Sequence, residues 1–141
     1  MNKDKIFGLF EDSSDGEVLK VKKIIPVNKG PYYKLGMFTK LILNHFVFHN
    51  KLEKFLQKEE PSYNVESTKE ASEFVVFNRA WNYINKIDIN KKEHIFAILD
   101  FNPHLLSSAL ESALIYFEGL EEYEKCAHLF KIQKVLKESK R

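Results

Sequence analysis

The chain has 141 residues, of which 44% are hydrophobic and 30% charged, which is enough apolar material for one globular domain. The formal net charge of +2 is too small to indicate a polyanionic partner by itself. No run approaches the roughly 18 apolar residues of a membrane span, so we expect no membrane partner. The single cysteine, Cys126, has no intramolecular disulfide partner, which favours a reducing compartment and, by default, a cytoplasmic location.

The first 30 residues have the composition of extended structure. Residues 6–10 and 18–25 are apolar or β-prone and flank the turn-forming cluster at residues 12–16. This pattern predicts a small N-terminal β-hairpin over residues 1–30. A lone two-stranded hairpin is marginally stable in water, so it would pack on the rest of the protein or on a partner.

A helix is predicted from about Gly36 to the residues before Pro61. Its apolar positions follow the i, i+3, i+4, i+7 spacing of an amphipathic helix. They are Phe38, Leu41, Ile42, His45, Phe46, His49, Leu52, Phe55 and Leu56. Residues 61–70 are polar and predict a loop, and Ser67 or Thr68 is the expected cap of a second helix from Ala71 to about Ile87.

Three further helices are expected in the remaining chain. The first is short, over residues 90–100, and Asn102 followed by Pro103 is a strong start signal for the next. Gly119 can end that helix, and the last runs from Glu121 to about Glu138. The expected fold class is mostly α: a four- to five-helix bundle over residues 36–141 with the small N-terminal β-hairpin, all in a single domain 1–141.

The last two predicted helices carry a local resemblance to known helical hairpins. Within residues 113–136, an aromatic–Glu pair, a small–small pair and two leucines resemble the UVR-type hairpin of bacterial excision-repair subunits. The same segment resembles a tetratricopeptide hairpin. The residues concerned are Tyr116, Phe117, Gly119, Tyr123, Glu124, Cys126, Ala127, Leu129 and Leu136. Either resemblance implies protein–protein docking.

Residues that carry catalytic or metal chemistry are sparse. His45 and His49 have the i, i+4 spacing of a metal pair but lack companion ligands, so we expect an aromatic helix face. Glu124 and His128 have the same spacing and predict a surface pair, whereas Cys126 predicts a small buried side chain. The scattered glycines form no phosphate-binding loop. We therefore expect no enzyme activity, no catalytic residues, no metal, no cofactor and no small-molecule substrate.

Residues 18–52 contain seven lysines and no acid, with tyrosines among them. Lysines bind phosphates and exposed aromatic rings stack on bases, so this segment supports an alternative role as a nucleic-acid-associated regulator. The candidate contacts are Lys20, Lys22, Lys23, Lys29, Tyr32, Tyr33 and Lys34. A solvated lysine face is the simpler interpretation.

The aromatic content supports the leading interpretation. Twelve Phe, six Tyr and one Trp exceed what one helical stripe buries, so some are expected at a protein contact or a self-association surface. We interpret the chain as a small non-enzymatic adaptor, inhibitor or subunit, with a composition typical of bacterial or phage proteins. The candidate partner-binding residues are Phe46, Phe48, Phe74, Phe77 and Trp81.

Overall fold

The computed structural model describes residues 30–60, 62 and 64–139, and within them the only regular elements are five α-helices. In chain order these are α3 (Pro31–Glu59), α4 (Val65–Ile84), α5 (Lys92–Asp100), α6 (Pro103–Gly119) and α7 (Tyr123–Glu138). The mostly helical fold class is confirmed for this part of the chain. The predicted β-hairpin of residues 1–30 lies outside the described residues.

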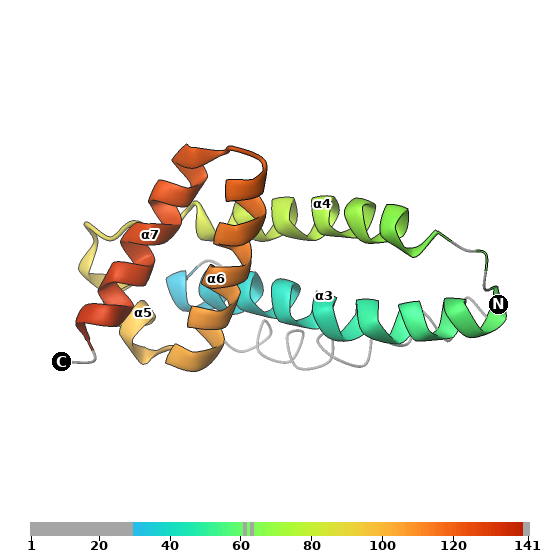
Figure 1. The fold of residues 1–141 in the computed structure, drawn as a ribbon. Helices are drawn as coiled ribbons and strands as arrows, with labels where there is room; N and C mark the ends of the chain where they lie inside the picture. Colours follow the sequence, from blue (N-terminus) through green and yellow to red (C-terminus); the bar gives the residue numbers. More distant parts are fainter. Residues whose placement is uncertain (1–29, 61, 63, 140–141) are drawn as a thin grey trace.

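Helices α3 and α4 run antiparallel and form the longest hairpin of the structure (Figure 1). Helix α3 begins at Pro31, five residues before the predicted start, because proline is well suited to the first helical turn. Its inward face carries Leu35, Phe38 and Ile42, all fully buried. These residues recur at helical spacing, which is why one side of α3 faces the core along this stretch.

The start of α4 corrects the prediction of a loop over residues 61–70. The helix begins at Val65, and the Asn64 side chain caps it by accepting a hydrogen bond from the Ser67 backbone N–H over 3.3 Å. Asn64, and neither Ser67 nor Thr68, is therefore the cap. Residues 65–70, which suggested a loop, belong to the first turns of the helix, and their polar side chains are mostly exposed.

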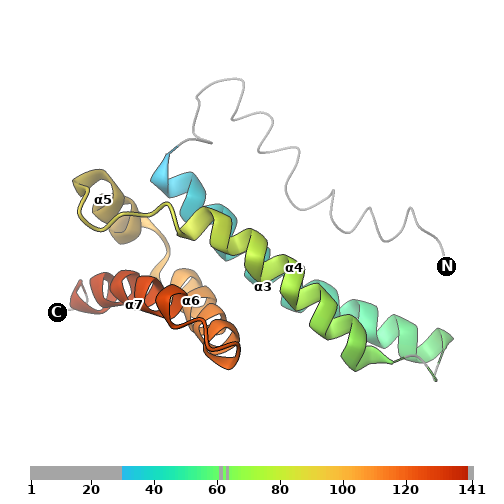
Figure 2. The same cartoon turned by 90° about the horizontal axis from the view of Figure 1, so that it is seen from above.

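A second hairpin, formed by α6 and α7, stands across one end of the first, and the short α5 lies at the same end (Figures 1 and 2). The predicted start of α6 is confirmed, because the Asn102 side chain accepts hydrogen bonds from the backbone N–H groups of His104 and Leu105. Pro103 occupies the first helical turn.

The core lies where the two hairpins cross. Phe77 of α4 stacks on Tyr116 of α6 with ring centroids 4.4 Å apart, and Phe117 is fully buried beside them. Burial of such aromatic side chains stabilises the fold by about 1.5–3 kcal/mol each. Aromatic packing therefore holds the α6–α7 hairpin against α4.

The far part of the α3–α4 hairpin projects beyond α6 and α7 (Figures 1 and 2). Phe46 and Phe55 were both predicted on the inward stripe of α3 and are exposed, because this part of α3 packs on α4 without a third helix. None of the helices in the described ranges combines the length and the apolar character that crossing a bilayer requires.

Candidate functional site

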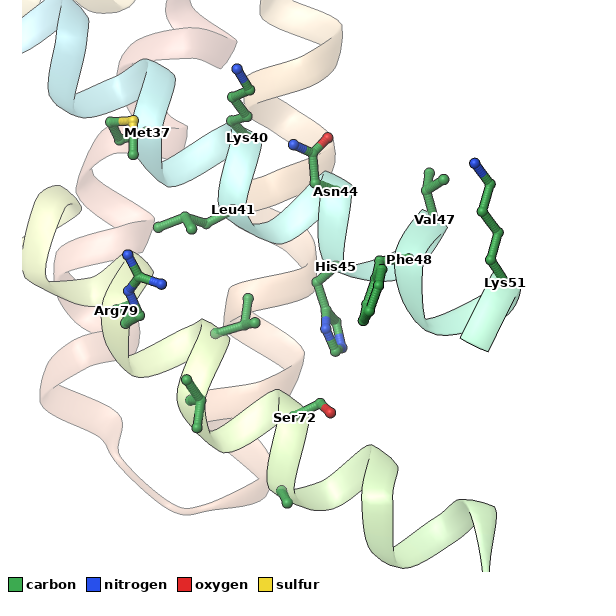
Figure 3. Close-up of a pocket in the computed structure, with 13 residues that line it drawn as sticks. Met37, Lys40, Leu41, Asn44, His45, Val47, Phe48, Lys51, Ser72 and Arg79 are labelled. Atoms are coloured by element: carbon green, nitrogen blue, oxygen red, sulfur yellow. The ribbon is translucent and has the colours of Figure 1, made fainter. Parts of the chain in front are cut away.

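An open groove of about 610 Å³ lies between α3 and α4, and the described residues that line it all come from these two helices (Figure 3). Its lining residues are Met37, Lys40, Leu41, Asn44, His45, Val47, Phe48, Lys51, Ala71, Ser72, Val75, Val76 and Arg79. Figure 3 shows His45 and Phe48 projecting from α3 on the side of α4. The groove is therefore built between the two helices, with side chains of both as its walls.

The groove combines apolar walls with positive charge. Of the lining residues in the described part of the chain, seven are apolar, three are cationic and none is Asp or Glu. The cations are Lys40 and Lys51 on α3 and Arg79 on α4. Among the described residues, none of the three forms an ion pair. Uncompensated charge beside low-dielectric walls gives the groove a positive potential, which favours an anionic, partly apolar occupant.

His45 forms part of the groove wall and is almost fully buried. Its ring stacks on His49 with centroids 5.7 Å apart. Burial, together with the neighbouring His49 and Lys69, lowers the pKa of His45 below its ordinary value. His45 is therefore neutral near pH 7 and adds no charge to the groove.

His49 lies in the same face of α3 without a metal-like environment. Both of its ring nitrogens are buried and lack a hydrogen-bond partner, and the nearest acid is Glu53, 3.8 Å from Nε2. Within the residues that the structure describes, no three His, Cys, Asp or Glu side chains gather to hold an ion. The two histidines stack on each other, and the His45 ring also contacts Phe46 of α3 and Phe77 of α4.

The five predicted partner-binding residues fall into three environments. Phe48 lines the groove. Phe46 and Phe74 are 41% and 62% exposed on the projecting hairpin. Phe77 is only 2% exposed and Trp81 is half-buried against the core. The prediction that Phe77 belongs to a contact surface is thus wrong, because its ring is used in packing α4 against α6.

Trp81 and His128 connect α4 to α7. The Trp81 ring lies edge-on to Phe117 and to His128, with centroids 5.9 and 5.4 Å away. His128 Nε2 lies 2.8 Å from the backbone carbonyl oxygen of Ile84. The predicted surface pair of Glu124 and His128 is therefore wrong, because the imidazole points across the interface to α4.

Cys126 is buried in the α6–α7 hairpin, as predicted. Its Sγ lies 3.9 Å from the Leu114 carbonyl oxygen. Burial raises the pKa of the thiol, and the neighbouring Glu118 and Glu122 add to that rise. A buried thiol with a raised pKa is a poor nucleophile.

The predicted nucleic-acid residues are only partly described. Tyr32 is exposed and lies against Phe101, with centroids 5.3 Å apart. Tyr33 is half-buried against Tyr83, and burial raises its pKa. Lys34 is also half-buried. The remaining candidates, Lys20, Lys22, Lys23 and Lys29, lie outside the described residues.

Sequence reasoning did not single out the cations of the groove. Lys40 and Lys51 are separated by three helical turns, so they share one face of α3, and this spacing was visible in the sequence. Arg79 joins them only because α4 folds back along α3. Its contribution required the tertiary structure.

Comparison of the chain with models of protein families, with curated proteins and with solved structures gives no match. Evidence on function therefore comes from the structure, and chiefly from the groove and its charges.

Proposed function

We propose that this protein is a non-enzymatic interaction protein whose α3–α4 groove binds an acidic, amphipathic segment of a protein partner. The observation that carries the proposal is the groove itself, whose described lining residues give it apolar walls and three cations but no carboxylate. A partner segment with one apolar face and flanking acids matches both properties. This is the helix-in-groove mode by which amphipathic segments are commonly recognised.

The roles of the groove residues follow from their chemistry. Phe48 and Val75 supply apolar contact area, which gives most of the affinity of such a complex. Lys40, Lys51 and Arg79 orient the acidic side of the partner and speed its association. Phe46 and Phe74 are exposed on the same two helices but do not line the groove.

The second candidate function is nucleic-acid binding, and one observation favours it. The same three groove cations are suited to backbone phosphates, and Tyr32 is an exposed ring at the start of α3. Mostly aliphatic walls, which stack poorly on bases, make the protein partner our preferred proposal. The two functions differ in salt dependence, because phosphate binding weakens steeply as salt rises.

The hairpin resemblance stays a prediction that is compatible with this proposal. Residues 113–136 correspond to the C-terminal part of α6, the connecting turn and most of α7. UVR-type and tetratricopeptide hairpins both dock proteins, so a second contact on this side of the molecule would extend the same role.

A photo-crosslinking experiment tests the proposed function. Benzoylphenylalanine replaces Val75, a groove residue that is 53% exposed, and the variant is irradiated in the cells that make the chain. We expect a covalent adduct with a peptide that is rich in acids and apolar residues. The matched control carries the probe at Ile115 of α6, which is 73% exposed and outside the groove.

Charge reversal sharpens the same experiment. With the probe at position 75, Lys40→Glu and Arg79→Glu should each reduce the yield of the acidic adduct several-fold. An adduct with nucleic acid would support the second candidate function. Equal labelling from positions 75 and 115 would show that the groove has no selective partner.

A further inference from the structure

The acidic, apolar occupant that the groove requires has a match within the chain itself. Residues 4–17 contain five acids and one lysine, and the acids Glu11, Asp12, Asp15 and Glu17 follow directly on the apolar cluster Ile6, Phe7, Leu9 and Phe10. The groove presents the complementary set, with aliphatic walls and the cations Lys40, Lys51 and Arg79. Charge and polarity therefore pair residues 4–17 with the groove.

The next part of the chain has the opposite charge and is not suited to the groove. Residues 18–29 contain four lysines and no acid. Lysines beside Lys40, Lys51 and Arg79 would repel these cations. The charge reversal between residues 17 and 18 thus defines which part of the first 29 residues can occupy the groove and which part connects it to α3.

Residues 18–29, which connect residues 4–17 to α3, are long enough to let residues 4–17 reach the groove. Helix α3 begins at Pro31, and the middle of the groove, near Asn44, lies about 20 Å further along the helix at 1.5 Å per residue. Twelve connecting residues span up to about 40 Å when extended. Residues 4–17 can therefore reach the groove of their own chain without any change in the helices.

We propose that residues 4–17 dock in the α3–α4 groove of the same molecule. The docking itself depends only on the groove and the sequence. Its regulatory consequence rests on the proposed function: a partner must displace residues 4–17 to bind. A tethered segment has an effective concentration in the millimolar range, so even weak docking would compete well with a dilute partner.

The test uses the purified full chain with benzoylphenylalanine at position 75. Irradiation at low protein concentration should link this position to the tryptic peptide of residues 6–20, at the mass of a single chain. The probe at position 115 serves as control and should give no such link. The double variant Phe7→Ser and Phe10→Ser should lower the yield at least about fivefold, as should Glu11→Gln with Asp12→Asn, which removes two charges and adds no trypsin site.

Control variants separate a loss of docking from a change in overall charge and from a loss of the fold. Lys22→Glu with Lys23→Glu changes the charge of the connection and should leave the yield from residues 6–20 intact. Helix content measured by circular dichroism verifies that each variant keeps its fold. A position-75 link to any other peptide, a link only at the mass of two chains, or no loss of yield in the Phe7 and Phe10 variant would each overturn the proposal.

The two proposals fail in different ways. If residues 6–20 crosslink in the purified protein but no acidic partner peptide is recovered from cells, docking stands and the proposed function is wrong. If a partner peptide is recovered but the purified chain gives no link to residues 6–20, the groove has its proposed function and the internal occupant is wrong. When both hold, removing the Phe7 and Phe10 side chains should raise the yield of partner adduct in cells.

Discussion

His128 of α7 and the carbonyl oxygen of Ile84 in α4 are joined by a hydrogen bond of 2.8 Å between helices 44 residues apart in sequence. A carbonyl oxygen only accepts, so the imidazole donates its Nε2–H and this nitrogen carries the proton. The bond ties the α6–α7 hairpin to the end of α4. The crossing of the two hairpins is thereby defined at this end, while the other end of α3–α4 projects beyond α6 and α7.

Replacement of His128 by Phe tests this tie. Phe keeps an aromatic ring beside Trp81 but cannot donate to Ile84, so we expect the free energy of unfolding to fall by about 1 kcal/mol in urea titrations. His104→Phe is the control, because His104 is exposed in the first turn of α6. Equal stability of the two variants would show that the hydrogen bond adds nothing net.

Phe77 and Phe74 lie three residues apart on α4 and should respond very differently to truncation. Phe77 stacks on Tyr116 in the core, so Phe77→Ala should lower the free energy of unfolding by about 3–5 kcal/mol. Phe74 is exposed, and Phe74→Ala should change it by no more than about 0.5 kcal/mol. Thermal or urea unfolding measures both. A small loss at Phe77 would contradict its place in the core.

The environment of His94 leads us to expect that the free energy of unfolding depends on pH. Its Nδ1 accepts a hydrogen bond from the Asp88 backbone N–H over 2.9 Å, and the pKa of His94 is lowered by burial and then by Lys91 and Lys34, against the smaller opposing effects of Asp88 and Glu93. Protonation of Nδ1 would abolish that bond.

The direction in which stability changes with pH follows from how many protons the folded and the unfolded chain bind. The unfolded chain titrates near the ordinary histidine value of 6.5, above the folded pKa, so it binds more protons as the pH falls. The free energy of unfolding should therefore decrease as the pH is lowered from 7 through 6.5 towards the lowered pKa. His94→Gln keeps an acceptor and removes the titration, so its stability should vary less between pH 7 and 5. An unchanged slope would assign the effect to other groups, of which His45 is the first candidate.

In the turn between α6 and α7, the residue with a left-handed backbone is Glu121 and not the nearby glycine, Gly119. Glu121 has φ of 60°, whereas Gly119 has no positive φ and a Cβ there would meet no atom within 4 Å. Gly119→Ala should therefore raise the free energy of unfolding by about 0.5–1 kcal/mol, and Glu121→Gly should raise it by relieving the left-handed backbone. Glu118→Gly, in the last helical turn, should lower it. Destabilisation by Gly119→Ala would contradict this geometry.

The cap of α6 provides a test of a feature that was already evident in the sequence. Asn102 accepts two hydrogen bonds from the first turn of the helix, so Asn102→Ala should lower the free energy of unfolding by about 1 kcal/mol. Asn82→Ala, at an exposed position within α4, is the control and should be neutral or slightly stabilising. An equal effect of both substitutions would argue against the cap.

The sequence by itself determined the features that depend on neighbouring residues. Helical periodicity located the five helices, and Asn102 with Pro103 marked the start of α6, because caps and proline geometry act within one turn. The same local reasoning misplaced the start of α4, since the polar residues after Pro61 are equally compatible with a loop and with the exposed side of a helix.

Only the tertiary structure decided which side chains are available at the surface. Phe74 and Phe77 have the same chemistry on the same helix, yet one is exposed and the other is buried, because α6 packs over only one side and part of the length of α4. Likewise, Lys40 and Lys51 gained Arg79 as a neighbour only when α4 folded back along α3. A groove between two helices depends on how they pack, and packing is a property of residues far apart in the sequence.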